Sequence, residues 1–174
     1  GNHGDYDYWI VKTDPSGMIQ WQKTYGGSGS DRLASAQQTT DGGYILAGLS
    51  GSKDGDVTGN HGSSDYWVVK IDPLGNIQWQ KSYGGSSLDN ATSVKQTFDE
   101  GYIIAGSSSS NNGDVTGNHG DFDYWVVKTD ALGNILWQKS YGGLKEDGYY
   151  YDYTVFDFSI FSPAIQQASD GGFI

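Results

Sequence analysis

The stretch "DYWVVKIDPLGNIQWQKSYGG" at residues 65–85 decides the fold, because it recurs with few changes at residues 7–27 and 123–143. The three copies begin 58 residues apart, and the phrase "GDVTGNHG" before the second and third copies recurs at the same interval. A fixed period of this length is typical of repeat architectures, in which each unit buries its apolar face against the next unit. We therefore expect one repeat domain over residues 1–174.

Four short segments recur in each repeat, and their residue patterns favour strands over helices. Residues 66–69 are apolar at four consecutive positions, which predicts a strand covered on both faces. Residues 77–83 alternate between apolar and polar side chains, which predicts a half-exposed outer strand. Residues 90–97 are mostly small or β-branched and suit a crowded inner strand, and residues 102–109 supply the fourth strand.

Four antiparallel strands per repeat predict an all-β fold built of β-propeller-like blades. Residues 1–31 hold the last two strands of one blade, residues 32–89 and 90–147 each hold a complete blade, and residues 148–174 hold an insert followed by the first two strands of another. The chain thus carries about three blade equivalents, a partial propeller. A solenoid or a string of separate hairpins is the alternative, because a repeat period alone does not distinguish these architectures.

The composition excludes several classes of function. The net charge of −11 with only 10 Lys and Arg residues gives nucleic acids and anionic membrane surfaces little to bind. No apolar run reaches the roughly 20 residues that a membrane-spanning helix needs. The absence of cysteine excludes thiol catalysis and disulfides, and the sequence has none of the common catalytic motifs. We therefore expect no enzyme activity.

Acidic and amide side chains gather in the loops on one face of the expected blades. Oxygen-rich loops are what Ca²⁺ requires, so calcium is the candidate cofactor, although none is required by the expected fold. The same residue types next to glycine are also ordinary turn formers, and this alternative stays open. The candidate ligands are Asp54, Asp56, Asn60, Asp114 and Asn118.

One histidine recurs in each repeat, as His3, His61 and His119. Three imidazoles could share a metal only if their loops converged, which blades placed side by side do not favour. We therefore expect each histidine to stabilise its own turn.

The segment "KIDPLGNIQW" at residues 70–79 resembles the tryptophan-docking motif of quinoprotein propellers. The resemblance implies that the tryptophan after the glycine turn packs between its own blade and the next one. Trp21, Trp79 and Trp137 occupy this place, and the second series is Trp9, Trp67 and Trp125. Large aromatic side chains in repeats normally serve the shared core, so we expect structural docking rather than a ligand platform.

The whole repeat, with "DEGYIIAGSSS" and "GDVTGNHG" beside the segments above, is similar to repeats of large secreted and cell-surface bacterial proteins. The resemblance is to cargo of the type IX secretion route. It implies an extracellular or cell-surface location and a longer parent chain, and it says little about activity.

The third repeat departs from the others by an insert near residues 148–161, "GYYYDYTVFDFSIF". Its aromatic residues alternate with polar ones, which is the period of a strand with aromatics on one side. We expect either an extra strand packed on its own blade or a surface that binds a partner, a glycan or a neighbouring copy. The candidate partner-binding residues are Tyr149, Tyr151, Tyr153, Phe156 and Phe158.

These features predict a non-catalytic extracellular surface module for adhesion or scaffolding. The first alternative is a self-assembling filament subunit, joined head to tail through incomplete blades. The second is a fragment of a propeller carbohydrate-active enzyme, which would need a pair of carboxylates at catalytic separation. The expected partners are further copies or blades, and glycans.

Overall fold

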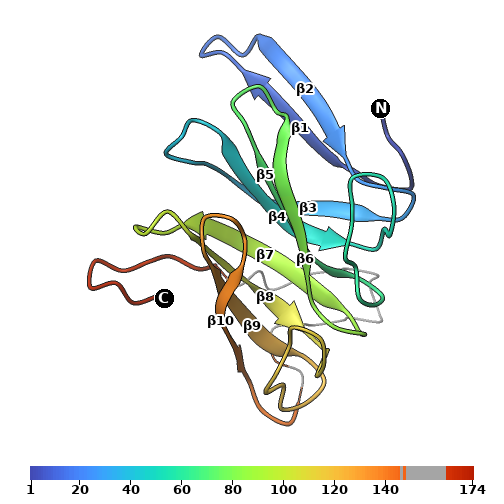
Figure 1. The fold of residues 1–174 in the computed structure, drawn as a ribbon, viewed down its shortest axis with the longest axis vertical. Helices are drawn as coiled ribbons and strands as arrows, with labels where there is room; N and C mark the ends of the chain where they lie inside the picture. Colours follow the sequence, from blue (N-terminus) through green and yellow to red (C-terminus); the bar gives the residue numbers. More distant parts are fainter. Residues whose placement is uncertain (146, 148–163) are drawn as a thin grey trace, which may run out of the picture.

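The computed structural model describes residues 1–145, 147 and 164–174, and all the regular secondary structure in these residues is β-strand (Figure 1). The strands are β1 (Tyr8–Thr13), β2 (Ile19–Tyr25), β3 (Asp31–Gln38), β4 (Tyr44–Ser50), β5 (Asp65–Ile71), β6 (Ile77–Tyr83), β7 (Asp89–Gln96), β8 (Tyr102–Ser108), β9 (Asp123–Thr129) and β10 (Ile135–Tyr141). The described residues contain no helix that is long and apolar enough to cross a membrane.

The strands pair in chain order into three antiparallel sheets. β1 and β2 form a two-stranded sheet, and β3–β6 and β7–β10 form two four-stranded sheets. Figure 1 shows the sheets arranged one after another, from β1–β2 at the top to β7–β10 at the bottom. The all-β fold of four-stranded repeats that the sequence predicts is confirmed, and its form is consistent with a partial propeller.

The innermost strands of successive sheets lie side by side. The backbone N–H of Val94 in β7 donates to the hydroxyl of Ser35 in β3 at 3.2 Å, and the N–H of Gln96 donates to the side-chain carbonyl of Gln37 at 2.8 Å. The N–H of Ile165 donates to the hydroxyl of Ser93 at 3.4 Å, which places residues 164–174 next to β7 in the same way. These inner strands therefore follow one another as the central strands of adjacent blades.

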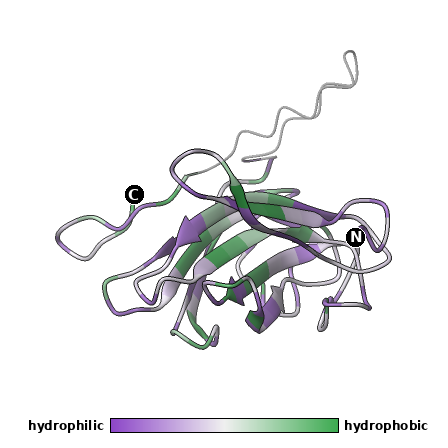
Figure 2. Cartoon of the chain, turned by 90° about the horizontal axis from the view of Figure 1, so that it is seen from above, coloured by the Kyte–Doolittle hydropathy of each residue, from purple (hydrophilic) through white to green (hydrophobic). Residues whose placement is uncertain are grey.

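The strand patterns agree with the burial that the sequence predicts. β5 is buried along its whole length, as expected from its continuous apolar run, whereas β6 is only partly buried. Figure 2 shows the hydropathy of each residue, with apolar residues concentrated along the strands and hydrophilic residues common in the connections.

The apolar core lies between the sheets. The first junction lies between β1–β2 and β3–β6, and the second junction lies between β3–β6 and β7–β10. A third, smaller cluster joins β7–β10 to Ile165 and Phe173 of the C-terminal segment. Each junction repeats the packing of the one before, which is how a repeat chain builds a continuous core.

The turn between β5 and β6 shows how the chain reverses direction. The carboxylate of Asp72 accepts the backbone N–H groups of Leu74 and Asn76, at 2.9 and 2.8 Å. Hydrogen bonds from Asn76 hold the pKa of Asp72 below its usual range. Gly75 has φ +78°, a conformation that suits glycine because it lacks a Cβ.

Candidate functional site

Tyrosine and tryptophan side chains connect the sheets at each junction. The rings of Tyr8 and Trp67 lie 4.6 Å apart, and those of Tyr66 and Trp125 lie 4.7 Å apart. The Tyr8 hydroxyl donates to the Trp67 carbonyl at 2.9 Å, and the Tyr66 hydroxyl donates to the Trp125 carbonyl at 3.0 Å. Burial raises the pKa of both tyrosines well above the usual value, so both hydroxyls remain protonated donors.

The tryptophans after the glycine turns pack against an aromatic residue of the following sheet or, for Trp137, of the C-terminal segment. The ring distances are 6.1 Å for Trp21 to Tyr44, 5.6 Å for Trp79 to Tyr102 and 5.8 Å for Trp137 to Phe173. These contacts support a structural role for the residues. The likeness to quinoprotein docking motifs itself stays an interpretation.

Trp9 differs from its two equivalents in the later repeats. Trp67 and Trp125 are completely buried in the junctions, whereas Trp9 is 64% exposed. Trp9 lies on the outer face of β1–β2, where no described sheet packs against it and only Gly1 of the N-terminal segment lies close by. The same residue type at the same repeat position therefore has two different environments.

A second tyrosine series binds the glycine turn of the following sheet. The Tyr25 hydroxyl donates to the Gly75 carbonyl at 2.7 Å, and the Tyr83 hydroxyl donates to the Gly133 carbonyl at 2.6 Å. A Cβ added at Gly133 would lie 3.0 Å from both the Tyr83 hydroxyl and the Trp79 ring, so the close approach requires glycine there. Burial, with a smaller effect of nearby carboxylates, raises the pKa of Tyr25 to about 12.

The candidate calcium ligands all make hydrogen bonds within the loops. Asp54 accepts the backbone N–H of Ser28 at 2.7 Å. Asp56 and Asp114 accept the N–H groups of Gly26 and Gly84, at 3.3 and 3.2 Å. The side-chain amide of Asn60 donates to the Ser50 carbonyl at 2.8 Å, and that of Asn118, 58 residues later, donates to the Ser108 carbonyl at 3.0 Å. The structure brings these residues into loop-stabilising roles, and calcium binding stays a prediction.

Each histidine pairs with an aspartate of its own repeat. The Nδ1 atoms of His61 and His119 lie 2.7 Å from the carboxylates of Asp65 and Asp123, respectively, and the same pair in the first repeat is 3.1 Å long. Among the residues that the structure describes, no three His, Cys, Asp or Glu side chains are grouped so that they could hold a metal ion. The hydrogen bonds of each histidine thus lie within its own turn.

A pair of buried carboxylates next to Gly84 was not expected from the sequence. A Cβ added at Gly84 would lie 2.5 Å from Asp89 Oδ2 and 2.9 Å from Asp65 Oδ1. The two carboxylates therefore lie close to each other beside Gly84. Asp89 is bonded by Ser108, Ser110 and the N–H of Gly85, but Asp65 Oδ1 has no hydrogen-bond partner among the described residues. Burial raises the pKa of Asp65, and the charge of Asp89 adds to this effect.

A buried lysine in each complete sheet was also missed. Lys70 Nζ lies 2.8 Å from the carboxylate of Asp41, and Lys128 Nζ lies 2.9 Å from that of Asp99. Each lysine side chain is almost fully buried within an otherwise apolar strand. A lysine in such a strand is the sequence signal that could have found the pair, because buried lysines need a partner.

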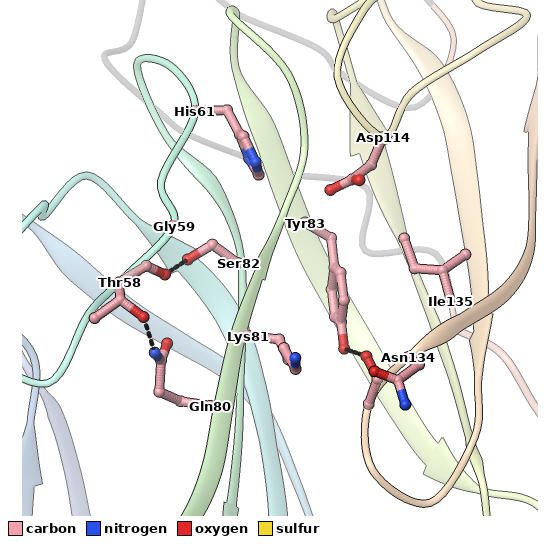
Figure 3. Close-up of a pocket in the computed structure, with 11 residues that line it drawn as sticks. Thr58, Gly59, His61, Gln80, Lys81, Ser82, Tyr83, Asp114, Asn134 and Ile135 are labelled. Carbon is pink, nitrogen blue, oxygen red and sulfur yellow. Dashed lines mark hydrogen bonds between the residues drawn. The ribbon is translucent and has the colours of Figure 1, made fainter.

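A polar cleft of about 510 Å³ opens between β6 and the turn that follows β9 (Figure 3). Lys81 and His61 line its β6 side, and Asp114 and Asn134 line the opposite side. Figure 3 shows the Lys81 ammonium without a hydrogen bond to the other residues drawn, whereas the Tyr83 hydroxyl is hydrogen-bonded to the Gly133 carbonyl. One oxygen of the Asp114 carboxylate accepts the N–H of Gly84 at 3.2 Å. Mixed donors and acceptors of this kind suit a polar ligand such as a sugar.

Comparison of the sequence with models of known protein families finds no match, and comparison with curated proteins finds no match either. The aromatic residues predicted to bind a partner, Tyr149 to Phe158, lie outside the described residues.

Proposed function

We propose that the chain is a non-catalytic module of the cell surface or extracellular space, used for adhesion or scaffolding. The observation that supports it is the repeated use of the same side chains for the same structural contacts. The tyrosine hydroxyls, the loop aspartates and the histidines of successive repeats bond the same partners, 58 residues apart. A framework held this way presents loops and clefts in a fixed array.

The buried acids favour a scaffold over the enzyme alternative. A glycoside hydrolase needs two carboxylates that reach the substrate. Asp65 and Asp89 lie close together, but both residues are 0% exposed. Asp65 begins β5 and Asp89 begins β7, and their complete burial gives a sugar no access to them. The alternative of a propeller enzyme is therefore the weaker proposal.

The polar cleft is the site that we assign to an adhesion ligand, and glycans are the class of ligand that its side chains suit. The Lys81 ammonium can donate to sugar hydroxyls and the Asp114 carboxylate can accept from them. At the first junction, the equivalent lysine, Lys23, donates to Asn76 at 2.8 Å. Lys23 and Asn76 are the equivalents of Lys81 and Asn134, so at the first junction the corresponding lysine is already hydrogen-bonded.

The experiment is binding of the purified chain to a printed array of neutral and acidic glycans. Lys81→Met should weaken binding to the best glycan about tenfold, the effect of losing one charge-assisted hydrogen bond. Lys53→Met is the matched control, because Lys53 is exposed and does not line the cleft. Unchanged binding by Lys81→Met, or hydrolysis of the arrayed glycans, would contradict the proposal.

Self-assembly is the second candidate function, and the exposed face of β1–β2 favours it. Trp9, Val11 and Ile19 are 64%, 37% and 60% exposed on this face. Their equivalents Trp125 and Val127 are 0% exposed in the second junction. An apolar patch that is buried in two repeats and exposed in the first indicates a surface for association.

A further inference from the structure

The second junction shows which two surfaces meet between blades. Tyr66, Val68 and Tyr83 of β5–β6 belong to one surface, and each is at most 3% exposed. Trp125 and Val127 of β9, with the partly buried Ile135 of β10, belong to the surface that packs against it. Each two-strand unit therefore carries a tyrosine surface on one side and a tryptophan surface on the other.

The tyrosine surface of β9–β10 is only partly covered by the residues that the structure describes. Tyr124, Val126 and Tyr141, which we call the receptor face, form this surface and stand 58 residues after Tyr66, Val68 and Tyr83. Tyr141 is 55% exposed, against 3% for Tyr83, and Tyr124 and Val126 are half-buried. A cavity of about 330 Å³ lies beside these three residues and extends to Trp137, Ile165 and Phe173.

The tryptophan surface of β1–β2 is the matching one. Trp9, Val11 and Ile19, which we call the donor face, stand 116 residues before Trp125, Val127 and Ile135. The same three residue types fill the second junction opposite the tyrosine surface. The donor face therefore carries the side chains that the receptor face would bury.

We propose that the receptor face of one copy binds the donor face of a second copy, so that Trp9 of the second copy packs on Tyr124. The proposal deepens the self-assembly candidate and rests on it. By analogy with the internal junctions, the Tyr124 hydroxyl donates to the Trp9 carbonyl and the Tyr141 hydroxyl to the Gly17 carbonyl. Gly17 has φ +84° and nothing within 4 Å of an added Cβ, so its turn is open to this approach.

Charge complementarity supports the same occupant. In each complete sheet the strand lysine pairs with the aspartate of the turn between the first two strands, as in Lys70–Asp41 and Lys128–Asp99. By the 58-residue period, the corresponding lysine of β1 is Lys12. The corresponding aspartate of the C-terminal segment is Asp170, because "QQASDGGFI" at 166–174 aligns with "QQTTDGGYI" at 37–45 once the 13 extra residues of the third repeat are allowed for. Neither forms an ion pair within the described residues.

Docking places Lys12 of the second copy next to Asp170 of the first copy. The reason is that β1 of the second copy and the C-terminal segment of the first copy then belong to one blade. Phe173 would pair with Thr13 of the second copy, as Tyr44 pairs with Ile71 and Tyr102 with Thr129. Exposed strand edges readily recruit another strand in this way. The interface thus has an aromatic contact, an ion pair and backbone pairing.

Under this proposal, two copies of the 174-residue chain together supply enough blades for a closed ring. Each copy has two four-stranded sheets and the two parts of a further blade, which gives about three blades per copy. Two copies have about six, within the 4–8 that propellers usually contain, and three copies exceed that range. We therefore expect a dimer of twice 18.8 kDa with two identical junctions.

Sedimentation velocity over a concentration series of the 174-residue chain tests the dimer. Trp9→Ala should weaken association at least about tenfold, because tryptophans at the centre of an interface contribute much of its energy. Phe98→Ala is the control, since Phe98 is 76% exposed and lies outside both faces. A chain that stays monomeric at all concentrations, or a dimer that Trp9→Ala leaves unchanged, overturns the proposal.

A charge exchange tests the pairing itself. Lys12→Glu alone places two acids at each junction, and Asp170→Lys alone places two lysines at each junction. Because like charges then face each other, each variant should dimerise at least about tenfold more weakly than the parent. An equal mixture should regain dimers, because both junctions of the mixed dimer then join opposite charges. Lys53→Glu makes the same charge change as Lys12→Glu away from the interface. A mixture that does not regain dimers overturns the pairing of Lys12 with Asp170. Glycan binding is measured separately with the Lys81 variants, so the glycan proposal and the dimer proposal can fail independently.

Discussion

The outer face of β1–β2 and the second junction have nearly the same sequence but different environments. Trp125 is 0% exposed and touches Tyr66 at a ring distance of 4.7 Å, whereas Trp9 is 64% exposed. The difference lies in the neighbouring sheet and not in the strand that carries the residue. In a repeat chain, burial is thus a property of the junction, and identical residues contribute to stability only where a following or preceding blade covers them.

Truncation of the two tryptophans gives the largest expected contrast. Trp125→Ala should lower the free energy of unfolding by about 3–5 kcal/mol, because it leaves a cavity in a packed core. Trp9→Ala should change it by less than about 0.5 kcal/mol, as for other exposed positions. Urea unfolding of both variants, at a protein concentration low enough to keep the chain monomeric, measures the difference. Equal losses would mean that Trp9 is covered in solution by a part of the same chain.

The buried lysines give the next largest effect. Hydrogen bonds from Lys70 and then Thr39 lower the pKa of Asp41 to about 2, below its usual value of 3.8. Because the folded-state pKa is depressed, this stabilisation is present above about pH 4 and is lost as the pH falls towards 2. Asp41→Asn should cost about 1 kcal/mol at pH 7, a modest figure because the carboxylate is half-exposed.

Thermal unfolding of Asp41→Asn from pH 7 to pH 2 checks this prediction, with Asp121→Asn as an exposed control. The variant should lose less stability than the parent below pH 4. It should keep part of the acid-dependent loss, because the pKa of Asp99 is also lowered to about 2, by Thr97 and Lys128. Parallel pH curves for the parent and Asp41→Asn would contradict the role of the ion pair.

The carboxylate pair next to Gly84 should respond in the opposite direction. Burial raises the pKa of both Asp65 and Asp89, so the folded chain binds protons more tightly than the unfolded chain. Tighter proton binding stabilises the fold below about pH 4, the pKa of an aspartate in the unfolded chain. This stabilisation is lost as the pH rises through the raised pKa values of Asp65 and Asp89 in the folded chain. Asp65→Asn removes one charge and supplies an amide donor towards Asp89.

We expect Asp65→Asn to raise the free energy of unfolding by on the order of 1 kcal/mol at pH 7, and by less at pH 4. Asp65→Ala is the contrasting variant, because it also removes the acceptor of the His61 N–H at 2.9 Å and should destabilise the chain. Thermal unfolding at the two pH values separates the cases. Destabilisation by Asp65→Asn at both pH values would show that the contact of Asp65 with His61 Nδ1 at 2.7 Å outweighs the gain from removing a buried charge.

The repeat period and strand pattern were enough to predict the all-β sheets, because both depend on residues close in sequence. The continuous apolar run of 66–69 predicted the buried strand β5 for the same reason. The exposure of Trp9 and the pair of Asp65 with Asp89 could not be predicted in this way. They depend on which sheet covers which face and on loops that meet only in space, information that a single repeat does not contain.

Calcium should have the smallest effect. The loop carboxylates already accept backbone N–H groups, at 2.7 Å for Asp54 and 3.3 Å for Asp56, and hydrogen bonds from Ser28 lower the pKa of Asp54. A cation would have to displace or share these bonds, and a ligand stabilises the fold only in proportion to its affinity. We therefore expect millimolar CaCl₂ and excess EDTA to give melting temperatures within about 1 °C of each other. If calcium instead raises the melting temperature by several degrees, and Asp54→Asn with Asp56→Asn abolishes the rise, the loops on this face form a calcium site in addition to their turns.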